Sequence, residues 1–307
     1  MLTRRGFMRW LLGLSAAAAA TGAYAFEIEP GWRLRVRRWD LRPPLWPRGR
    51  HLRIAVLADL HAGEPHMGRE RVRRIVDRAN GLGADLIALV GDYAQGHRFT
   101  RRPATPDEVA DDLSALSAPL GVWAVLGNHD WWDDPAAQAK AAGPTETHRA
   151  FAARGIPVLE NAAVRLEGRQ GPFWLAGLGD QLAFRGPAAA GRAPNPAALT
   201  PRQGVDDLPR ALAALTDDAP AILLAHEPDI FPRVPRRVAL TLAGHTHGGQ
   251  VRLLGWSPVV PSAYGSRYAY GPVEEHDRTL VVSGGLGCSL APIRFGAPPE
   301  ITLIDLS

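Results

Sequence analysis

Short apolar runs that end in Asp, Asn or His residues recur along the chain, and this pattern constrains the fold more than any other feature. Five such runs cover residues 53–58, 85–90, 122–126, 221–225 and 238–243. Apolar runs of this length, bounded by glycine and polar residues, are typical of buried strands. Ligand sites of α/β sheets usually form at the carboxyl ends of their strands. We therefore expect the polar residues that follow these runs to meet at one rim.

Amphipathic stretches separate the apolar runs in the first half of the chain. Residues 69–80 predict a helix. A second helix is expected to begin at Thr105, because Thr105 can cap it, Pro106 suits its first position and acids follow in the first turn. Further strands are expected at 173–177, 279–283 and 301–304, with a helix near 207–215. Early alternation followed mostly by strands predicts an α/β fold of two sheets flanked by helices.

The chain is predicted to divide into three parts. Residues 1–25 form an export signal, residues 26–50 a basic aromatic arm, and residues 51–307 one catalytic domain. Within that domain, residues 186–203 are rich in Ala, Gly and Pro. We interpret them as a surface loop, with a cover over the site as the alternative.

The charge distribution argues against a nucleic-acid partner. The net charge is +4, but the first 25 residues hold three arginines and no acid. Residues 26–53 carry a further +5, so that residues 54–307 sum to −4. A domain of that sign is not suited to following a long polyanion. We therefore expect no stable nucleic-acid partner, and a nuclease is only a weaker alternative.

The residues after the apolar runs are carboxylates, one amide and imidazoles. They fall in five motifs: Asp59-Leu60-His61, Gly91-Asp92, Gly127-Asn128-His129-Asp130, His226 and Gly244-His245-Thr246-His247. Mixed oxygen and nitrogen ligands suit Mn²⁺, Fe²⁺ or Zn²⁺ better than Mg²⁺ or Ca²⁺. The single cysteine, Cys288, excludes a cysteine-based zinc cluster. Each motif alone is as readily a turn or a helix cap, and only their ordered combination predicts a metal centre.

Phosphoester cleavage fits such a centre. Two divalent ions about 3.5 to 4 Å apart can activate water and neutralise both the attacking and the leaving oxygen. A carboxylate is the natural bridge between them. A metal-binding interaction module without turnover is the alternative from another class, but such a protein would be expected to lose ligands.

The ordered motifs resemble the signature of calcineurin-like metallophosphoesterases over about residues 50 to 307. The resemblance implies a four-layer αββα sandwich with two mixed sheets and a dinuclear metal site at the strand ends. It implies one ion held by Asp59, His61, Asp92 and His247, and a second held by Asp92, Asn128, His226 and His245. It also implies that His129 binds or protonates the phosphoester and that Asp130 orients His129.

The C-terminal motifs resemble a bacterial subgroup of exported phosphoesterases related to lipid A pathway pyrophosphatases. They are Gly-His-Thr-His-Gly-Gly-Gln, Gly284-Gly285-Leu286-Gly287 and Pro292-x-Arg294. Arg294 is a candidate for gripping a substrate phosphate, with an ordinary surface arginine as the alternative. Position 95 is Gln where purple acid phosphatases place a metal-binding tyrosine, and residues 93–96 lack the arginine of protein phosphatases. Both of those families are disfavoured.

Residues 1–25 resemble a twin-arginine export signal. Arg4-Arg5 precede an apolar run at 10–20, and Ala23-Tyr24-Ala25 is a small-x-small cleavage pattern. The run is short for a membrane-spanning helix, so a general signal or an uncleaved anchor is the alternative. We expect export in the folded state to the periplasm or the outer face of the cytoplasmic membrane. The predicted function is hydrolysis of phosphomonoesters or phosphodiesters there.

The arm at residues 32–46 has two interpretations. Arginines at 33, 35 and 37 alternate with apolar residues, which predicts a strand with one solvated basic face. Alternatively, Trp32, Trp39 and Trp46 could sit at a lipid headgroup interface while arginines contact anionic lipid. A membrane-associated hydrolase similar to UDP-2,3-diacylglucosamine pyrophosphatase is therefore the alternative function, although its substrate is cytoplasmic.

Overall fold

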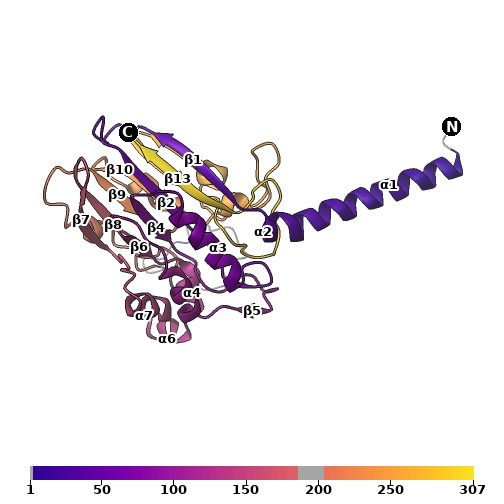
Figure 1. Cartoon of the computed structure of the whole chain (residues 1–307), viewed down its shortest axis with the longest axis horizontal. Coiled ribbons are helices and arrows are strands. Elements are labelled where there is room, and N and C mark those ends of the chain that lie inside the picture. The colour runs from indigo at the N-terminus through magenta and orange to yellow at the C-terminus, as the bar shows by residue number, and fades with distance from the viewer. Residues whose placement is uncertain (1–2, 186–203) are drawn as a thin grey trace.

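Two mixed β-sheets face each other in the computed structural model, which describes residues 3–185 and 204–307 (Figure 1). The first sheet has the order β1 (Arg35–Leu41), β13 (Glu300–Leu306), β2 (Leu52–Leu57), β4 (Leu86–Val90) and β6 (Val122–Val125). Only the β13–β2 pair is antiparallel. The loop predicted at 186–203 lies outside the described residues.

The second sheet has six strands. Its order is β11 (Gly271–Glu275), β12 (Arg278–Val282), β10 (Val238–Ala243), β9 (Ala221–Leu224), β8 (Gly171–Gly177) and β7 (Ala162–Gly168). The two edge pairs are antiparallel and the inner pairs are parallel. A short third sheet pairs β3 (Gly63–Glu64) with β5 (Arg102–Pro103).

Burial on both faces explains why the inner strands are apolar throughout. In β2, Ile54 and Val56 point into the core between the sheets, where they join Leu175 and Leu240. Ala55 and Leu57 point outward into the core under the helices. Strands buried on both faces are continuous hydrophobic runs rather than alternating ones.

Helices cover the outer faces of both sheets, so the predicted four-layer αββα sandwich is confirmed. The helices over the first sheet include α3 (Arg69–Asn80), α4 (Pro106–Leu113) and α7 (Glu146–Ala153). Shorter helices follow at α5 (Asn128–Trp132) and α6 (Pro135–Lys140). Over the second sheet lie α8 (Leu208–Leu212) and η4 (Pro228–Arg233). Two further short turns are η5 (His247–Gly249) and η6 (Gly265–Tyr268).

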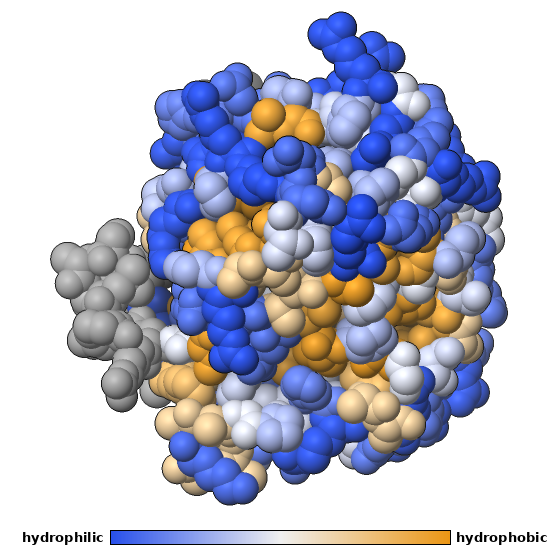
Figure 2. Space-filling view, turned by 90° about the vertical axis from the view of Figure 1, so that its left-hand side faces the viewer, coloured by the Kyte–Doolittle hydropathy of each residue, from blue (hydrophilic) through white to orange (hydrophobic). Residues whose placement is uncertain are grey.

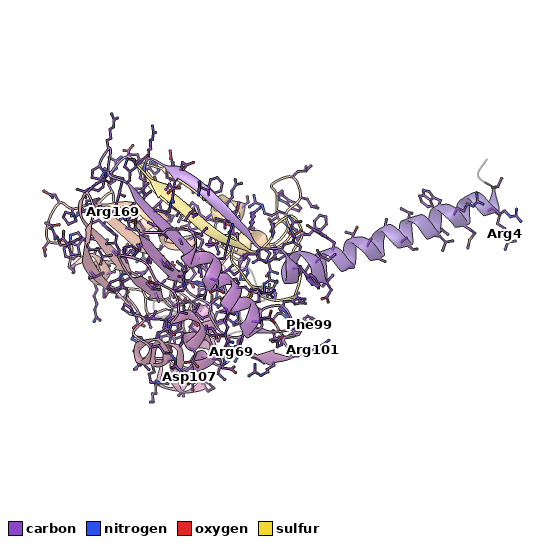
Figure 3. The ribbon with its side chains drawn as sticks, in the orientation of Figure 1. Arg4, Arg69, Phe99, Arg101, Asp107 and Arg169 are labelled. Carbon is purple, nitrogen blue, oxygen red and sulfur yellow. The ribbon has the colours of Figure 1, made fainter. Side chains whose placement is uncertain are left out.

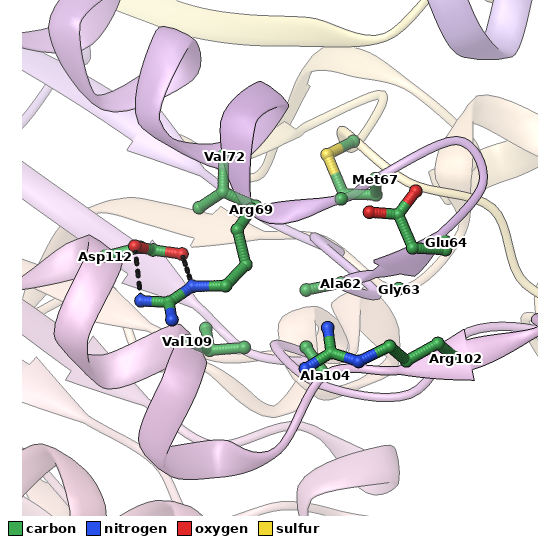
Figure 4. Close-up of a pocket in the computed structure, with 11 residues that line it drawn as sticks. Ala62, Gly63, Glu64, Met67, Arg69, Val72, Arg102, Ala104, Val109 and Asp112 are labelled. Atoms are coloured by element: carbon green, nitrogen blue, oxygen red, sulfur yellow. Dashed lines mark hydrogen bonds and ion pairs between the residues drawn. The ribbon is translucent and has the colours of Figure 1, made fainter.

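A buried carboxylate joins α3 to α4. Asp112 accepts two hydrogen bonds of 2.9 Å from the Arg69 guanidinium (Figure 4). It accepts a third, of 2.8 Å, from Arg73. The cavity beside this pair holds only about 10 Å³, which is room for about one water. This region is therefore structural rather than a candidate ligand site.

A long helix projects from one end of the molecule (Figures 1 and 3). It comprises α1 (Arg4–Ala23), the π-helical turn η1 (Tyr24–Ile28) and α2 (Glu29–Trp32). No residue of α1 is buried, and the 29-residue helix is long and apolar enough to cross a membrane, as a signal sequence also can be. The apolar run at 10–20 was expected to be short for a span. The helix is longer than that run, because η1 continues it past the predicted cleavage point after Ala25.

The arm following this helix is built into the first sheet. β1 pairs in parallel with β13 along its whole length and forms the sheet edge. Trp39 packs edge-on against Tyr270, and Trp46 is 3% exposed and packs against Phe173. Trp46 is therefore buried and Trp39 partly buried, so Trp32 is the exposed one of the three tryptophans considered for a lipid interface. Contact of the arm with a membrane surface stays a prediction. The division of the chain at residues 25 and 50 stays a prediction.

Candidate metal centre

The carboxyl ends of five strands deliver the seven predicted ligands to one rim. Asp59 and His61 follow β2, Asp92 follows β4, Asn128 follows β6, His226 follows β9, and His245 and His247 follow β10. All of these are buried except His245, which is partly exposed. Within each sheet the parallel strands end on the same side, and the two sheets face each other, so these residues come together at one rim as expected.

Two groups of side chains are close enough to hold an ion each. Asp59, His61 and His247 form one group, and Asp92, His226 and His245 form the other, with ligand atoms within 4.8 Å of one another in each. Oδ2 of Asp92 lies 3.4 Å from Nε2 of His61 and 3.2 Å from Nε2 of His226. One carboxylate oxygen thus lies between ligands of both groups, which is the place of a bridge.

The imidazole tautomers fit metal ligation. Nδ1 of His61 lies 2.7 Å from the Gln95 carbonyl, and Nδ1 of His226 lies 2.7 Å from the Val90 carbonyl. Because a carbonyl only accepts, each Nδ1 donates and each Nε2 turns toward the Asp92 carboxylate. Burial lowers the pKa of His61 to about 3, so its Nε2 presents a lone pair rather than a proton. A lone pair facing a carboxylate is repulsive unless a cation lies between them.

Buried polar atoms without partners mark the same place. Oδ2 of Asp59 and Oδ1 of Asn128 have no hydrogen-bond partner among the described residues. An unsatisfied buried polar atom costs about 1–3 kcal/mol. Burial raises the pKa of Asp92, but His226 and His129 lower it further than that. The pKa lies well below its ordinary value, so Asp92 is an ionised carboxylate. A divalent cation would satisfy all of these atoms, so the residues present fit the metal.

The backbone is strained where the ligands are. Positive φ angles occur at five of the seven: Asp59, His61, Asp92, His245 and His247. For residues other than glycine this region is sparsely populated, and such strain clusters at functional sites. Glycine is required beside them, because a Cβ on Gly91 would lie 2.4 Å from Nδ1 of His226. A Cβ on Gly127 would lie 2.4 Å from Oδ1 of Asp92.

Comparison with known proteins agrees with this geometry. A family model described as calcineurin-like phosphoesterase matches residues 52–249, well over half of the chain. The chain is a calcineurin-like phosphoesterase. Members of this family use two divalent metal ions to hydrolyse phosphoric esters, and the two Asp/His groups provide for them.

Relatives match this phosphoesterase over most of its length. It is 28% identical to the uncharacterized metallophosphoesterase YkuE of Bacillus subtilis, over 99% of this chain and 98% of that protein. It is 29% identical to phosphodiesterase YaeI of Escherichia coli over 100% of both chains. It is also 29% identical to a zebrafish (Danio rerio) transmembrane protein with metallophosphoesterase domain, over 83% of this chain and 53% of that protein.

His129 lies at the edge of the phosphoesterase centre. Its side chain is 18% exposed, and its backbone N–H donates to Oδ1 of Asp92 at 2.9 Å. Burial lowers the pKa of His129, but Asp92 and Asp133 outweigh burial and raise the pKa above its ordinary value. An imidazole in this position can donate a hydrogen bond to a phosphoester held at the centre. His129 also lies within 4.8 Å of ligand atoms of His61 and Asp92.

Asp130, predicted to orient His129, makes no hydrogen bond to the His129 side chain in the described structure. Its carboxylate instead accepts hydrogen bonds from the backbone N–H groups of Asp92 and Gly127, both at 2.9 Å. The group that contacts His129 is Asp133, whose Oδ2 lies 3.1 Å from Nδ1. Asp133 is the C-cap of α5, four residues after His129, so helical spacing was the sequence signal that could have found it. Asp130 acts as a tie between the loops after β4 and β6.

Arg294, predicted to bind a substrate phosphate, does not lie at the surface of the centre. Arg294 is fully buried, and its N–H groups donate to the carbonyls of Gly284, Gly287 and Ala297. Nη2 also lies 3.3 Å from Nδ1 of His247. The guanidinium therefore holds the glycine-rich turn, with four of its five N–H groups donating to backbone carbonyls, and it packs against the predicted ligand His247.

Proposed function

We propose that this phosphoesterase hydrolyses phosphodiesters, and phosphomonoesters more slowly, on the outer side of the cytoplasmic membrane. The observation that carries the chemistry is Oδ2 of Asp92, placed between two groups of unpartnered ligand atoms. Mixed carboxylate, amide and imidazole ligands favour Mn²⁺, Fe²⁺ or Zn²⁺. The name of the full-length relative phosphodiesterase YaeI supports a diester as the substrate.

Four acidic or histidine residues have separate roles in the proposed reaction. When bound, two divalent ions supply a nucleophile at neutral pH and offset the phosphoryl charge. Asp92 keeps its negative charge shared between the two groups. His129, oriented by Asp133, donates a proton to the leaving oxygen from Nε2. Asp130 keeps the loops of Asp92 and His129 at a fixed separation, so that donor and ligands stay aligned.

A panel of three substrate types tests the proposed reaction. The metal-loaded full chain is offered a phosphodiester, a phosphomonoester and a nucleotide-pyrophosphate ester at equal concentration. We expect the highest kcat/KM for the diester and no turnover after chelation. A clear preference for the pyrophosphate bond would instead favour the alternative similar to UDP-2,3-diacylglucosamine pyrophosphatase. No turnover of any of the three with Mn²⁺, Fe²⁺ or Zn²⁺ would favour a binding module.

Export by the twin-arginine route is the proposed way to the outer side. Arg4 and Arg5 are the first residues of α1, and no residue of α1 is buried. The paired arginines are therefore accessible on the folded protein. Replacing Arg4 and Arg5 together by lysine should abolish export of a reporter fused to residues 1–30, because lysine keeps the charge but not the guanidinium pair. Arg9→Lys is the matched control and should be exported normally. Export of the double variant at the parental level would show that a general signal is used.

A further inference from the structure

A basic cavity of about 300 Å³ lies on the same rim as the metal centre but apart from it. Arg35, Arg37, Arg252 and Tyr270 line the cavity, together with Gly248, the residue after the predicted ligand His247. None of the seven predicted metal ligands lines it. The cavity is therefore a second candidate site, with its own positive charge.

Two of its three arginines have no acidic partner. Nη2 of Arg35 is neutralised by Glu300 at 2.6 Å. Arg37 and Arg252 form no ion pair with any residue that the structure describes, and their guanidinium groups lie over the rings of Trp39 and Tyr270 at 4.0 and 4.5 Å. Nη1 of Arg252 is buried without a hydrogen-bond partner in the described chain. Stacked guanidinium groups with free N–H donors are suited to a phosphate.

An apolar hairpin tip adjoins these arginines. Leu253 and Trp256 exchange backbone hydrogen bonds of 2.8 and 3.0 Å, which leaves Leu254 and Gly255 as the two turn residues. Both have positive φ, +53° and +87°, a turn that normally takes Asn, Asp or Gly at each position. Leu254 is fully exposed and lines the cavity, and Trp256 is 60% exposed. A fully exposed leucine in a strained backbone conformation is unfavourable in water, so the tip is better suited to an apolar environment.

The cavity also touches the base of the projecting helix. Ala297, in the cavity wall, donates its N–H to Oε1 of Glu29 in α2 at 2.7 Å. The 20 residues of α1 extend for about 30 Å, the thickness of a bilayer core. At its base Phe26, Ile28 and Trp32 are exposed. Figure 1 shows α1 leaving this end of the molecule, whereas hydrophilic side chains interrupt the apolar ones on the opposite face (Figure 2).

We propose that α1 is retained and enters a membrane, and that this cavity binds the phosphate headgroup of an anionic phospholipid there, with Leu254 and Trp256 among the acyl chains. Unpaired arginines and an exposed apolar tip stand side by side, which matches a headgroup with its attached chains and not a free anion. Binding holds the metal-centre rim against the bilayer. The inference does not depend on the proposed hydrolysis, because binding is measured without turnover.

Native mass spectrometry of the full chain in neutral detergent tests this inference. The probes are phosphatidylglycerol, phosphatidylcholine and inorganic phosphate, offered to the parent and to the double variant Arg37→Gln with Arg252→Gln. We expect the parent to prefer phosphatidylglycerol. The double variant should lose roughly 25-fold in affinity for it, since each arginine near an anionic bilayer contributes about fivefold. Arg169→Gln is the control, because Arg169 is 85% exposed at the end opposite α1 (Figure 3).

Three results would overturn the inference. Equal binding of the two lipids by the parent would mean that α1 alone makes the contact. An unchanged preference in the double variant would remove the arginines from the site. Inorganic phosphate that binds the parent as tightly as the lipid, and is lost in the double variant, would make the cavity a free-anion site.

A second variant keeps the test valid if the double variant does not fold. Leu254→Asn suits the positive φ of the turn, so folding should be preserved. We expect weaker phosphatidylglycerol binding with unchanged phosphate binding. Phosphatidylglycerol affinity equal to the parent's would contradict insertion of the tip.

Discussion

Replacing Asp92 by asparagine is expected to empty both metal sites. Oδ2 of Asp92 lies 3.4 Å from His61 and 3.2 Å from His226, so the same atom serves both groups. Asparagine keeps the size of the side chain but removes the shared negative charge. Losing even an outer partner of a ligand typically costs 10- to 100-fold in metal affinity, so we expect more than about 100-fold at each site. Metal content per folded chain after dialysis measures this directly.

Two further variants make the Asp92→Asn result interpretable. His61→Ala should chiefly disturb the group formed with Asp59 and His247, and leave about one equivalent of metal. Asp112→Asn also removes a buried carboxylate, but Asp112 pairs with Arg69 and Arg73 and belongs to neither group. It should therefore retain two equivalents. Two equivalents at unchanged affinity in Asp92→Asn would show that Asp92 does not bridge.

Strand ends were the part of this site that the sequence could predict. Each apolar run has a clear boundary, and the first polar residues beyond it are fixed at the rim by the parallel pairing of β2, β4 and β6. This pairing brings together Asp59, His61, Asp92 and Asn128. The three histidines His226, His245 and His247 follow the parallel strands β9 and β10 of the second sheet, and they join the first set because the two sheets face each other. The helix at 69–80 and the start at Thr105 were also confirmed, because amphipathic spacing and capping act locally.

Roles that depend on side-chain direction could not be predicted in the same way. Asp130 turns toward the loop after β4, a contact that exists only because β4 and β6 are neighbours in the sheet. Arg294 is buried because the turn at Gly284–Gly287 presents carbonyls to it. Its backbone N–H donates to Ala25, at the base of the projecting helix. Asp92 and Asp130 are 38 residues apart, and Ala25 and Arg294 lie near opposite ends of the chain, so no local sequence pattern predicts these contacts.

Replacing His129 by alanine is expected to leave metal binding intact and to slow turnover. Nδ1 of His129 is held by Asp133 at 3.1 Å, which leaves Nε2 free to donate toward a leaving oxygen. Proton transfer by a positioned side chain typically contributes about 10²- to 10⁴-fold. We therefore expect at least about a 100-fold lower kcat for esters with poor leaving groups, and a smaller loss for activated aryl esters, whose leaving groups need little protonation. Steady-state kinetics across a leaving-group series measures the difference.

Asp133→Asn separates orientation from the donor itself. It should reproduce part of the His129→Ala loss and the same dependence on the leaving group, because the imidazole stays but is no longer held by a carboxylate. Asp130→Asn, in contrast, should lower activity for all esters alike, since Asp130 contacts backbone groups and not His129. Loss of metal together with activity in His129→Ala would identify His129 as a ligand, in keeping with its place within 4.8 Å of His61 and Asp92. An equal loss for every leaving group would assign it to charge stabilisation instead of proton donation.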